Sequence, residues 1–309
     1  MKKFCFAAFL LCTTAGLAMP IASSARSMVP SEIQQLFGID YRALKDSPTA
    51  QALKEKVLPE NVKDSETALK RIGIDAEHDL DQLSVAAFRT EKKGIQTVYV
   101  AQGSFSAKAV LKKMKLKKIA GAKYGTAVIY PMDNGLVMTF LDDNTLAFGT
   151  QDSLQSALDT RDGKRPSLDS NPVMTDQMSA VDSAPLWSIL DQKGTQAMMF
   201  SVMGDAAKVA DYETIKKRIL ASRYTMNFAS GVNFDMSVQT ADSMTAATAA
   251  TLFKGVMLYK KMNASAVEKT AIDATTVDSD SSNLQVHFKS DDQKFQSLMN
   301  SPLFAAISH

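Results

Sequence analysis

The sequence has 309 residues, with 35 Lys and Arg against 33 Asp and Glu, so its formal net charge is only +2. This near-neutral balance lacks the basic excess typical of nucleic-acid-binding proteins. Both cysteines, Cys5 and Cys12, lie near the N-terminus, which excludes disulfides, thiolate metal sites and a cysteine nucleophile from the rest of the chain.

The first 25 residues predict a secretory signal peptide. Lys2 and Lys3 give a basic start, and the apolar run 4–18 that follows is too short for a comfortable membrane span. Ser23-Ser24-Ala25 offers a small-x-small cleavage sequence, so we expect a mature chain that begins at Arg26 and carries no net charge. The sequence therefore predicts an exported protein, periplasmic or secreted, without a later transmembrane segment.

Residues 26–73 are expected to form an N-terminal helical segment. Ser31 and Gln34 have the spacing of a capping box, and the apolar residues of 33–37 suggest one helical face. Pro48 fits the first position of a second helix, and a third helix should run from about Ser65 to Ile72 and stop at Gly73. We expect these helices to pack across the sheet that follows.

Residues 74–172 predict a first α+β unit. An acidic turn (74–81) leads into a hairpin, a helix (106–116), three further strands and a short helix (152–158). The strands are expected at Leu83–Arg89, Ile95–Gly103, Tyr124–Tyr130, Leu136–Leu141 and Thr145–Gly149. Residues 160–172 have the composition of a linker and mark the expected boundary.

Residues 173–309 predict a second, similar unit. Its dominant feature is a long helix over 242–262, with a buried stripe expected at Ala249, Leu252, Phe253, Val256 and Tyr259. Before it we expect helical segments at 173–181 and 195–220, a strand near Trp187 and a strand pair over 224–240. Strands at 272–277 and 283–289 and a last helix from 291 follow. The fold class predicted is α+β, with two similar units of mainly antiparallel sheet, helices on one face, and an internal duplication.

Several turns and strand starts resemble those of a loose group of exported bacterial proteins of unknown function. They are residues 39–48 (IDYRALKDSP), Gly73-Ile74-Asp75, Asp79-Leu80-Asp81, Gly103-Ser104-Phe105, Tyr124-Gly125 and Phe148-Gly149. The resemblance covers residues 38–190 and extends faintly into the second half. It implies the architecture and no activity.

Histidine is too scarce to favour catalysis or a metal site. Besides the terminal His309, His287 should lie on the solvent-exposed face of a strand and His78 in the acidic turn. His78 with Asp75, Glu77, Asp79 and Asp81 can be considered for a metal, but the spacing matches neither an EF-hand nor a zinc motif. Asp75 and Asp79 fit backbone capping better, and we expect no cofactor.

Two surfaces are candidates for binding. Lysines dominate the expected helix at 106–116 and the turn after it, which suits either a solvated face or an anion patch: Lys108, Lys112, Lys113, Lys115, Lys117 and Lys118. Methionines near the long helix, together with one phenylalanine, suit either the core or an adaptable apolar groove: Met199, Met203, Phe253, Met257 and Met262.

The function predicted from sequence is a non-enzymatic binding or interaction protein of the bacterial envelope. Its partner would be an envelope protein or an apolar ligand, with an anionic surface as a further possibility and nucleic acid disfavoured. An envelope hydrolase with a carboxylate pair is the alternative from another class, and a purely structural component is the third.

Overall fold

The computed structural model describes residues 20–57, 60–91, 93–203 and 212–308. The predicted signal peptide therefore lies outside the described residues, except for its last six positions. Among those six, Ile21 and Ala25 are buried in the core, and a short helix, α1 (Ser23–Arg26), contains Ala25. A mature chain that began at Arg26, as predicted, would lack both of these side chains.

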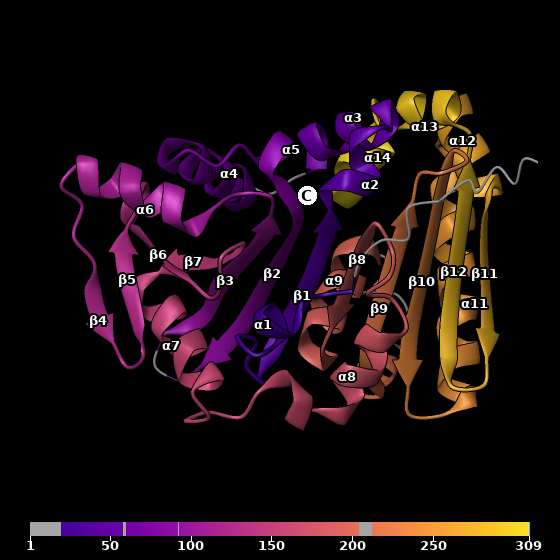
Figure 1. The fold of residues 1–309 in the computed structure, drawn as a ribbon. Helices are drawn as coiled ribbons and strands as arrows, with labels where there is room; N and C mark the ends of the chain where they lie inside the picture. Colours follow the sequence, from indigo (N-terminus) through magenta and orange to yellow (C-terminus); the bar gives the residue numbers. More distant parts are fainter. Residues whose placement is uncertain (1–19, 58–59, 92, 204–211, 309) are drawn as a thin grey trace, which may run out of the picture.

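A twelve-stranded antiparallel sheet runs through the whole molecule (Figure 1). Its order is β11-β12-β10-β9-β8-β1-β2-β3-β7-β6-β5-β4. The strands of the first half are β1 (Ile33–Asp40), β2 (Leu80–Thr90), β3 (Gly94–Gly103), β4 (Ala122–Tyr124), β5 (Ala127–Pro131), β6 (Leu136–Phe140) and β7 (Thr145–Thr150). Those of the second half are β8 (Leu186–Leu190), β9 (Ile219–Asn227), β10 (Val232–Thr240), β11 (Thr275–Asp280) and β12 (Asn283–Ser290).

The strand order repeats on either side of the central pair β1 and β8. Reading outward, one side runs β1-β2-β3-β7-β6 and the other runs β8-β9-β10-β12-β11, so the chain visits corresponding positions in the same sequence. The first side adds β5 and β4 at its edge. The α+β class and the mainly antiparallel pairing predicted from sequence are confirmed.

Helices cover both faces of the sheet, although most lie on one. On that face are α2 (Tyr41–Lys45), α3 (Pro48–Val57), α4 (Glu60–Ile72), α5 (Ala76–Asp79), α6 (Ala107–Leu116), α9 (Gln192–Met203), α10 (Tyr212–Lys217), α11 (Ser243–Met262), α12 (Ala266–Asp273), α13 (Asp292–Leu298) and α14 (Pro302–Ser308). The opposite face carries α1, α7 (Gln151–Arg161) and α8 (Pro172–Ser179). Most helices therefore pack on one face, as predicted, and the exceptions α1, α7 and α8 lie against strands of both halves.

The helix expected over 31–37 is wrong, because these residues belong to the central strand β1. A bulge shifts the pairing with β2 between Ile33 and Gln35. It leaves Ile33 and Leu36 in the same apolar cluster although they are three residues apart. This spacing imitates a helical face, whereas a regular strand would place the two side chains on opposite faces.

Local signals elsewhere act as the sequence predicts. Ser106 caps α6 by accepting a hydrogen bond from the Ala109 N–H, and Asp242 caps α11 through the Thr245 N–H at 2.8 Å. The predicted strand Tyr124–Tyr130 is instead a hairpin of β4 and β5, with Gly125 at positive φ in its turn. The sequence missed α12, which a capping box of Ser265 and Glu268 begins.

Candidate functional site

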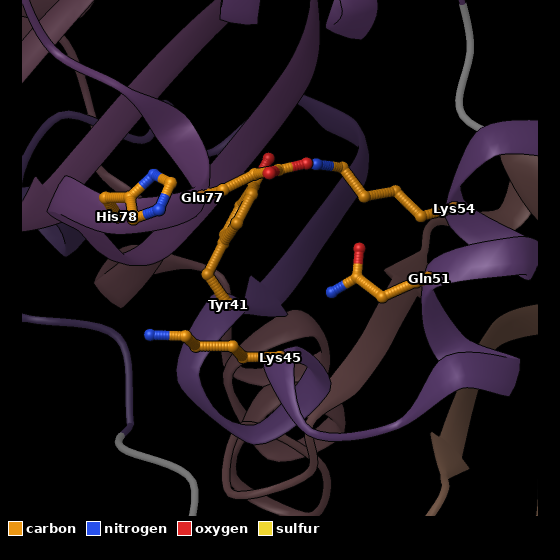
Figure 2. Close-up of a pocket in the computed structure, with 6 residues that line it drawn as sticks. All are labelled: Tyr41, Lys45, Gln51, Lys54, Glu77 and His78. Carbon is orange, nitrogen blue, oxygen red and sulfur yellow. The ribbon is translucent and has the colours of Figure 1, made fainter.

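A small pocket lies where α2, α3 and α5 meet. It has a volume of about 260 Å³ and is lined by Tyr41, Lys45, Gln51, Lys54, Glu77 and His78. Figure 2 shows Gln51 and Lys54 extending from α3 toward Tyr41, with Glu77 and His78 on the helix across the pocket. The lining is polar, so the pocket does not suit an apolar ligand.

Tyr41 and Lys54 are tied together through one carboxylate at this pocket. The Tyr41 hydroxyl donates to Glu66 Oε1, and Lys54 Nζ lies 2.9 Å from the same oxygen. Lys54 Nζ also sits 4.8 Å from the centroid of the Tyr41 ring. Burial, and then the Glu66 charge, raise the pKa of Tyr41 well above its ordinary value. A tyrosine held neutral by a shared ion pair stabilises the N-terminal helices and is a poor acid or base at neutral pH.

The acidic turn beside the pocket is a set of helix caps. The Asp75 carboxylate accepts from the Glu77 N–H at 3.0 Å, and the Asp79 carboxylate accepts from the Asp75 N–H at 2.7 Å. His78 Nδ1 lies 3.2 Å from Asp75, and this contact is the main reason why the pKa of Asp75 is lowered. The capping role predicted for Asp75 and Asp79 is confirmed. Within the described ranges, no three His, Asp or Glu side chains gather in a metal-binding arrangement.

A wider cleft of about 710 Å³ lies between the β2–β3 hairpin end and α7. Three of the four acidic residues that line it have partners: Asp152 pairs with Lys93, Asp159 accepts from the Tyr124 hydroxyl at 3.0 Å, and Glu32 lies 3.7 Å from Arg165. A hydrolytic carboxylate pair requires one group held protonated. Asp182 is a carboxyl group whose pKa burial raises, and it lines neither cavity. These contacts give the hydrolase alternative no support.

His287 projects from β12 on the uncovered, polar face of the sheet. Its exposed ring lies 2.6 Å from Asp235 of β10, while the neighbouring Val286 and Leu284 are buried on the other face. The predicted solvent-exposed face of this strand is confirmed. His309 lies outside the described residues.

The lysines predicted as an anion patch all reach solvent from α6 and its C-terminal turn. None of the six forms an ion pair with a described carboxylate. Val110 and Met114 are buried on the inner face of the helix, whereas Ala109 is exposed. Leu116, at the end of the helix, is 77% exposed.

The residues predicted to line an apolar groove are mostly core residues. Met199, Met203 and Phe253 are buried together between the sheet and the helices α9 and α11, and Met257 packs against them half-buried. Met262 alone points to solvent, with 77% of its surface exposed. The structure thus favours the core interpretation that the sequence also allowed.

An exposed apolar surface does exist on α11, on the face opposite that core. We call it the outer seam, formed by Met244, Thr248, Thr251, Gly255, Leu258 and Met262, all exposed. Successive members are four, three, four, three and four residues apart, the spacing that places side chains along one line of a helix. The outer seam contains no charged residue.

Polar groups of the outer seam are satisfied within the helix itself. The Thr248 hydroxyl donates to the Met244 carbonyl at 2.8 Å, and the Thr251 hydroxyl donates to the Ala247 carbonyl at 2.9 Å. A Cβ added at Gly255 would meet nothing within 4 Å. Tyr259, expected in the buried stripe, lies beside the seam and is 67% exposed. The seam is therefore an apolar strip with an open centre.

The outer seam was not predicted from sequence, because only the buried stripe of the long helix was assigned a role. The signal was present: positions 244, 248, 251, 255, 258 and 262 follow a heptad spacing without a single charge. A solvated helix face ordinarily carries charged residues, so an uncharged second stripe opposite the core stripe marks a helix with two packing faces.

Comparison with known proteins gives a fold and no function. No protein-family model matches the chain, and no curated protein does. The solved structure of crystal form I of TP0453 is similar, with a TM-score of 0.50 and 9% identity, over 92% of this chain and 97% of that chain. Crystal forms IV and III of TP0453 give TM-scores of 0.47 and 0.46 at 11% and 10% identity, over 92% and 89% of this chain and 97% and 96% of theirs. Two of the motifs that resemble exported bacterial proteins lie against each other in the fold, because the Ser104 N–H donates to the Asp79 carbonyl at 2.7 Å. No helix among the described residues has the length and apolarity needed to cross a membrane. The similarity to crystal form I shows that the chain shares the fold of TP0453 across nearly its whole length.

Proposed function

We propose that this is an exported, non-enzymatic interaction protein of the bacterial envelope, which binds a partner protein through the outer seam of α11. The observation that carries the proposal is the uncharged, heptad-spaced strip on a 20-residue helix whose other face is already buried. Exposed apolar strips of this kind mark interaction sites in proteins. A helix of the partner, packed along α11, would cover the strip.

The cavities favour a protein partner over a small apolar ligand. Both pockets are lined mainly by charged and amide side chains. A site for an apolar ligand is lined predominantly by apolar side chains, with only a few polar groups. The strip on α11 is convex and open, which suits a helix rather than a small molecule.

Site-specific photo-crosslinking in intact cells tests the proposal. A photoreactive residue would replace Thr251 in the seam, and the same residue would replace Thr67 of α4 as the matched control. Both are exposed helical threonines whose hydroxyls bond to the carbonyl four residues back, at 2.9 and 3.1 Å. We expect a discrete adduct from position 251 only, lost when Leu258→Lys is added. Equal adducts at both positions, or none at 251, would refute the proposal.

The unpaired lysines of α6 support a second contact, with an anionic component of the envelope. Six like charges on one helix and its turn repel one another, and an anionic surface would offset that repulsion. Binding to vesicles with and without anionic phospholipid measures it. Lys112→Glu with Lys115→Glu should abolish a salt-sensitive difference between the vesicles, while Lys216→Glu, on α10, should not.

The repeated strand order supports the internal duplication predicted from sequence, although not the predicted start of the first unit at residue 74. In this proposal, β1 and β8 are the first strands of the two repeats, so the first repeat begins earlier than residue 74. Unfolding monitored by hydrogen exchange would test the division, since independent units should open separately.

A further inference from the structure

The outer seam of α11 is complementary to itself when two copies run antiparallel. We infer that the partner that covers it is a second copy of this chain, an inference that rests on the proposed function. In an antiparallel pair centred near Phe253, Met244 of one copy meets Met262 of the other. Thr248 then meets Leu258, and Thr251 meets Gly255. Two methionines thus meet at each end, a small side chain faces a large one at Thr248 and Leu258, and the smallest pair lies at the centre.

The centre of the seam allows two helix backbones to approach closely. Gly255 has no side chain and nothing of its own chain within 4 Å of where a Cβ would lie. Its neighbour Thr251 directs its hydroxyl back into the helix, which leaves its methyl group outward. Small residues at a helix crossing permit such close packing. A glycine inside an exposed helix costs stability relative to alanine, and nothing within the chain compensates for it.

Charges beside the seam favour a copy of the same chain over a highly charged partner. Lys254 Nζ lies 3.5 Å from Asp278, and Lys261 pairs with Asp273, so each flanking lysine has its own aspartate. This flank is electrically balanced, so an acidic or basic partner would gain little from it. In an antiparallel dimer, the Lys254–Asp278 pair of one copy would lie on the same side of the interface as that pair of the other copy. Positive and negative charges would then alternate along this flank. A symmetric pair of identical surfaces is also the commonest mode of protein self-association.

The sheet edge next to α11 is a poorer route to a dimer. Its outermost strand, β11, carries the exposed carboxylates of Asp278 and Asp280. Pairing two copies of this edge would bring carboxylates together, and charged residues on edge strands typically prevent such pairing. The helix face, rather than the strand edge, is therefore the surface that fits a second copy.

Sedimentation velocity over a concentration series tests the inference. We expect the wild type to dimerise, and Leu258→Lys and Gly255→Trp each to raise the dissociation constant about tenfold or more. The matched control is Leu116→Lys on α6, which replaces a leucine of 77% exposure compared with 67% at Leu258. Leu116→Lys should dimerise like the wild type. Thermal melts of the dissociated Leu258→Lys and wild-type proteins should overlay, because Leu258 does not belong to the core, and Gly255→Trp should melt no lower than the wild type, because it removes a helix-destabilising glycine.

Disulfide trapping gives the orientation, because the chain beyond residue 12 contains no cysteine. In a background with Cys5→Ser and Cys12→Ser, protein carrying Thr248→Cys is mixed with protein carrying Leu258→Cys and oxidised. An antiparallel pair yields the mixed disulfide in preference to either homodimeric one. A predominance of homodimeric disulfides would overturn the antiparallel arrangement.

The outcomes separate this inference from the proposed function. A wild type that stays monomeric at its highest soluble concentration overturns the dimer. If that monomer still forms a seam-dependent adduct with another protein at position 251 in cells, the proposed function stands alone. A monomer that forms no adduct at position 251 refutes both.

Discussion

Replacing Gly255 with alanine should make the isolated protein more stable. Gly255 lies inside α11, where glycine is less favourable than alanine by roughly 0.8–1 kcal/mol because its backbone loses more freedom on folding. The added Cβ would meet nothing within 4 Å, so no clash opposes the gain. We therefore expect the free energy of unfolding to rise by about 0.5–1 kcal/mol.

Urea denaturation of dilute, dissociated protein, followed by far-ultraviolet circular dichroism, measures this gain. In a domain of this size, 1 kcal/mol corresponds to a rise in the melting temperature of about 2–4 °C. The same substitution should not strengthen self-association, because it adds bulk where two helices come closest. An unchanged or lower stability would show that Gly255 has a role inside the folded chain, and would remove the main reason for placing a partner over it.

Three further predictions concern the core and its ionisable groups. Gly38→Ala should lower the free energy of unfolding by about 1–3 kcal/mol, because a Cβ there would lie 2.5 Å from the buried Trp187 ring; equal urea midpoints for variant and wild type would contradict it. Glu66→Gln should move the pKa of Tyr41 part of the way back toward its ordinary value, since burial is the larger cause of the rise; tyrosinate absorbance compared with a Tyr41→Phe protein measures it, and an unmoved titration would refute the shared ion pair. Backbone N–H groups of Ser265 and Leu303 lower the pKa of Glu268 in the folded state. Its ionised form therefore stabilises the protein above its unfolded-state pKa, and this contribution is lost as the pH falls through the folded-state pKa. The stability difference between wild type and Glu268→Gln should shrink in acid, and a difference that persists at low pH would exclude the linkage.

Local chemistry accounts for much of what the sequence predicted correctly. Helix α11 was expected over 242–262 and spans Ser243–Met262, because Asp242 caps its start and the apolar repeat runs without interruption. The hairpin of β2 and β3 also lies where alternating side chains placed it. The acidic turn was interpreted correctly as caps, since Asp beside free N–H groups at a helix start is a short-range signal.

Only the tertiary structure decided how the two halves of the molecule share one sheet. Ile33 and Leu36 had the spacing of a helix, yet a bulge and two neighbouring strands, β2 and β8, hold them in the central strand β1. Over these eight residues the local preference for helix is weak, and backbone pairing with a strand on each side outweighs it. The residues of β1 themselves do not indicate that their partner strands lie about fifty and 150 residues away.

The candidate site divides in the same way. The apolar spacing along α11 predicted most of the buried stripe correctly, since Ala249, Phe253 and Val256 are buried and Leu252 is half-buried, but it wrongly included Tyr259. Packing placed Phe253 and Val256 inward and left Leu258, Tyr259 and Met262 in solvent. Of the residues expected in a groove, all but Met262 pack in the core, because α9 lies on β9 and α11 lies on β10, β11 and β12. That the opposite, uncharged stripe stays uncovered depends on how the rest of the chain packs around α11, and these non-local contacts are not recorded in the spacing of the helix itself.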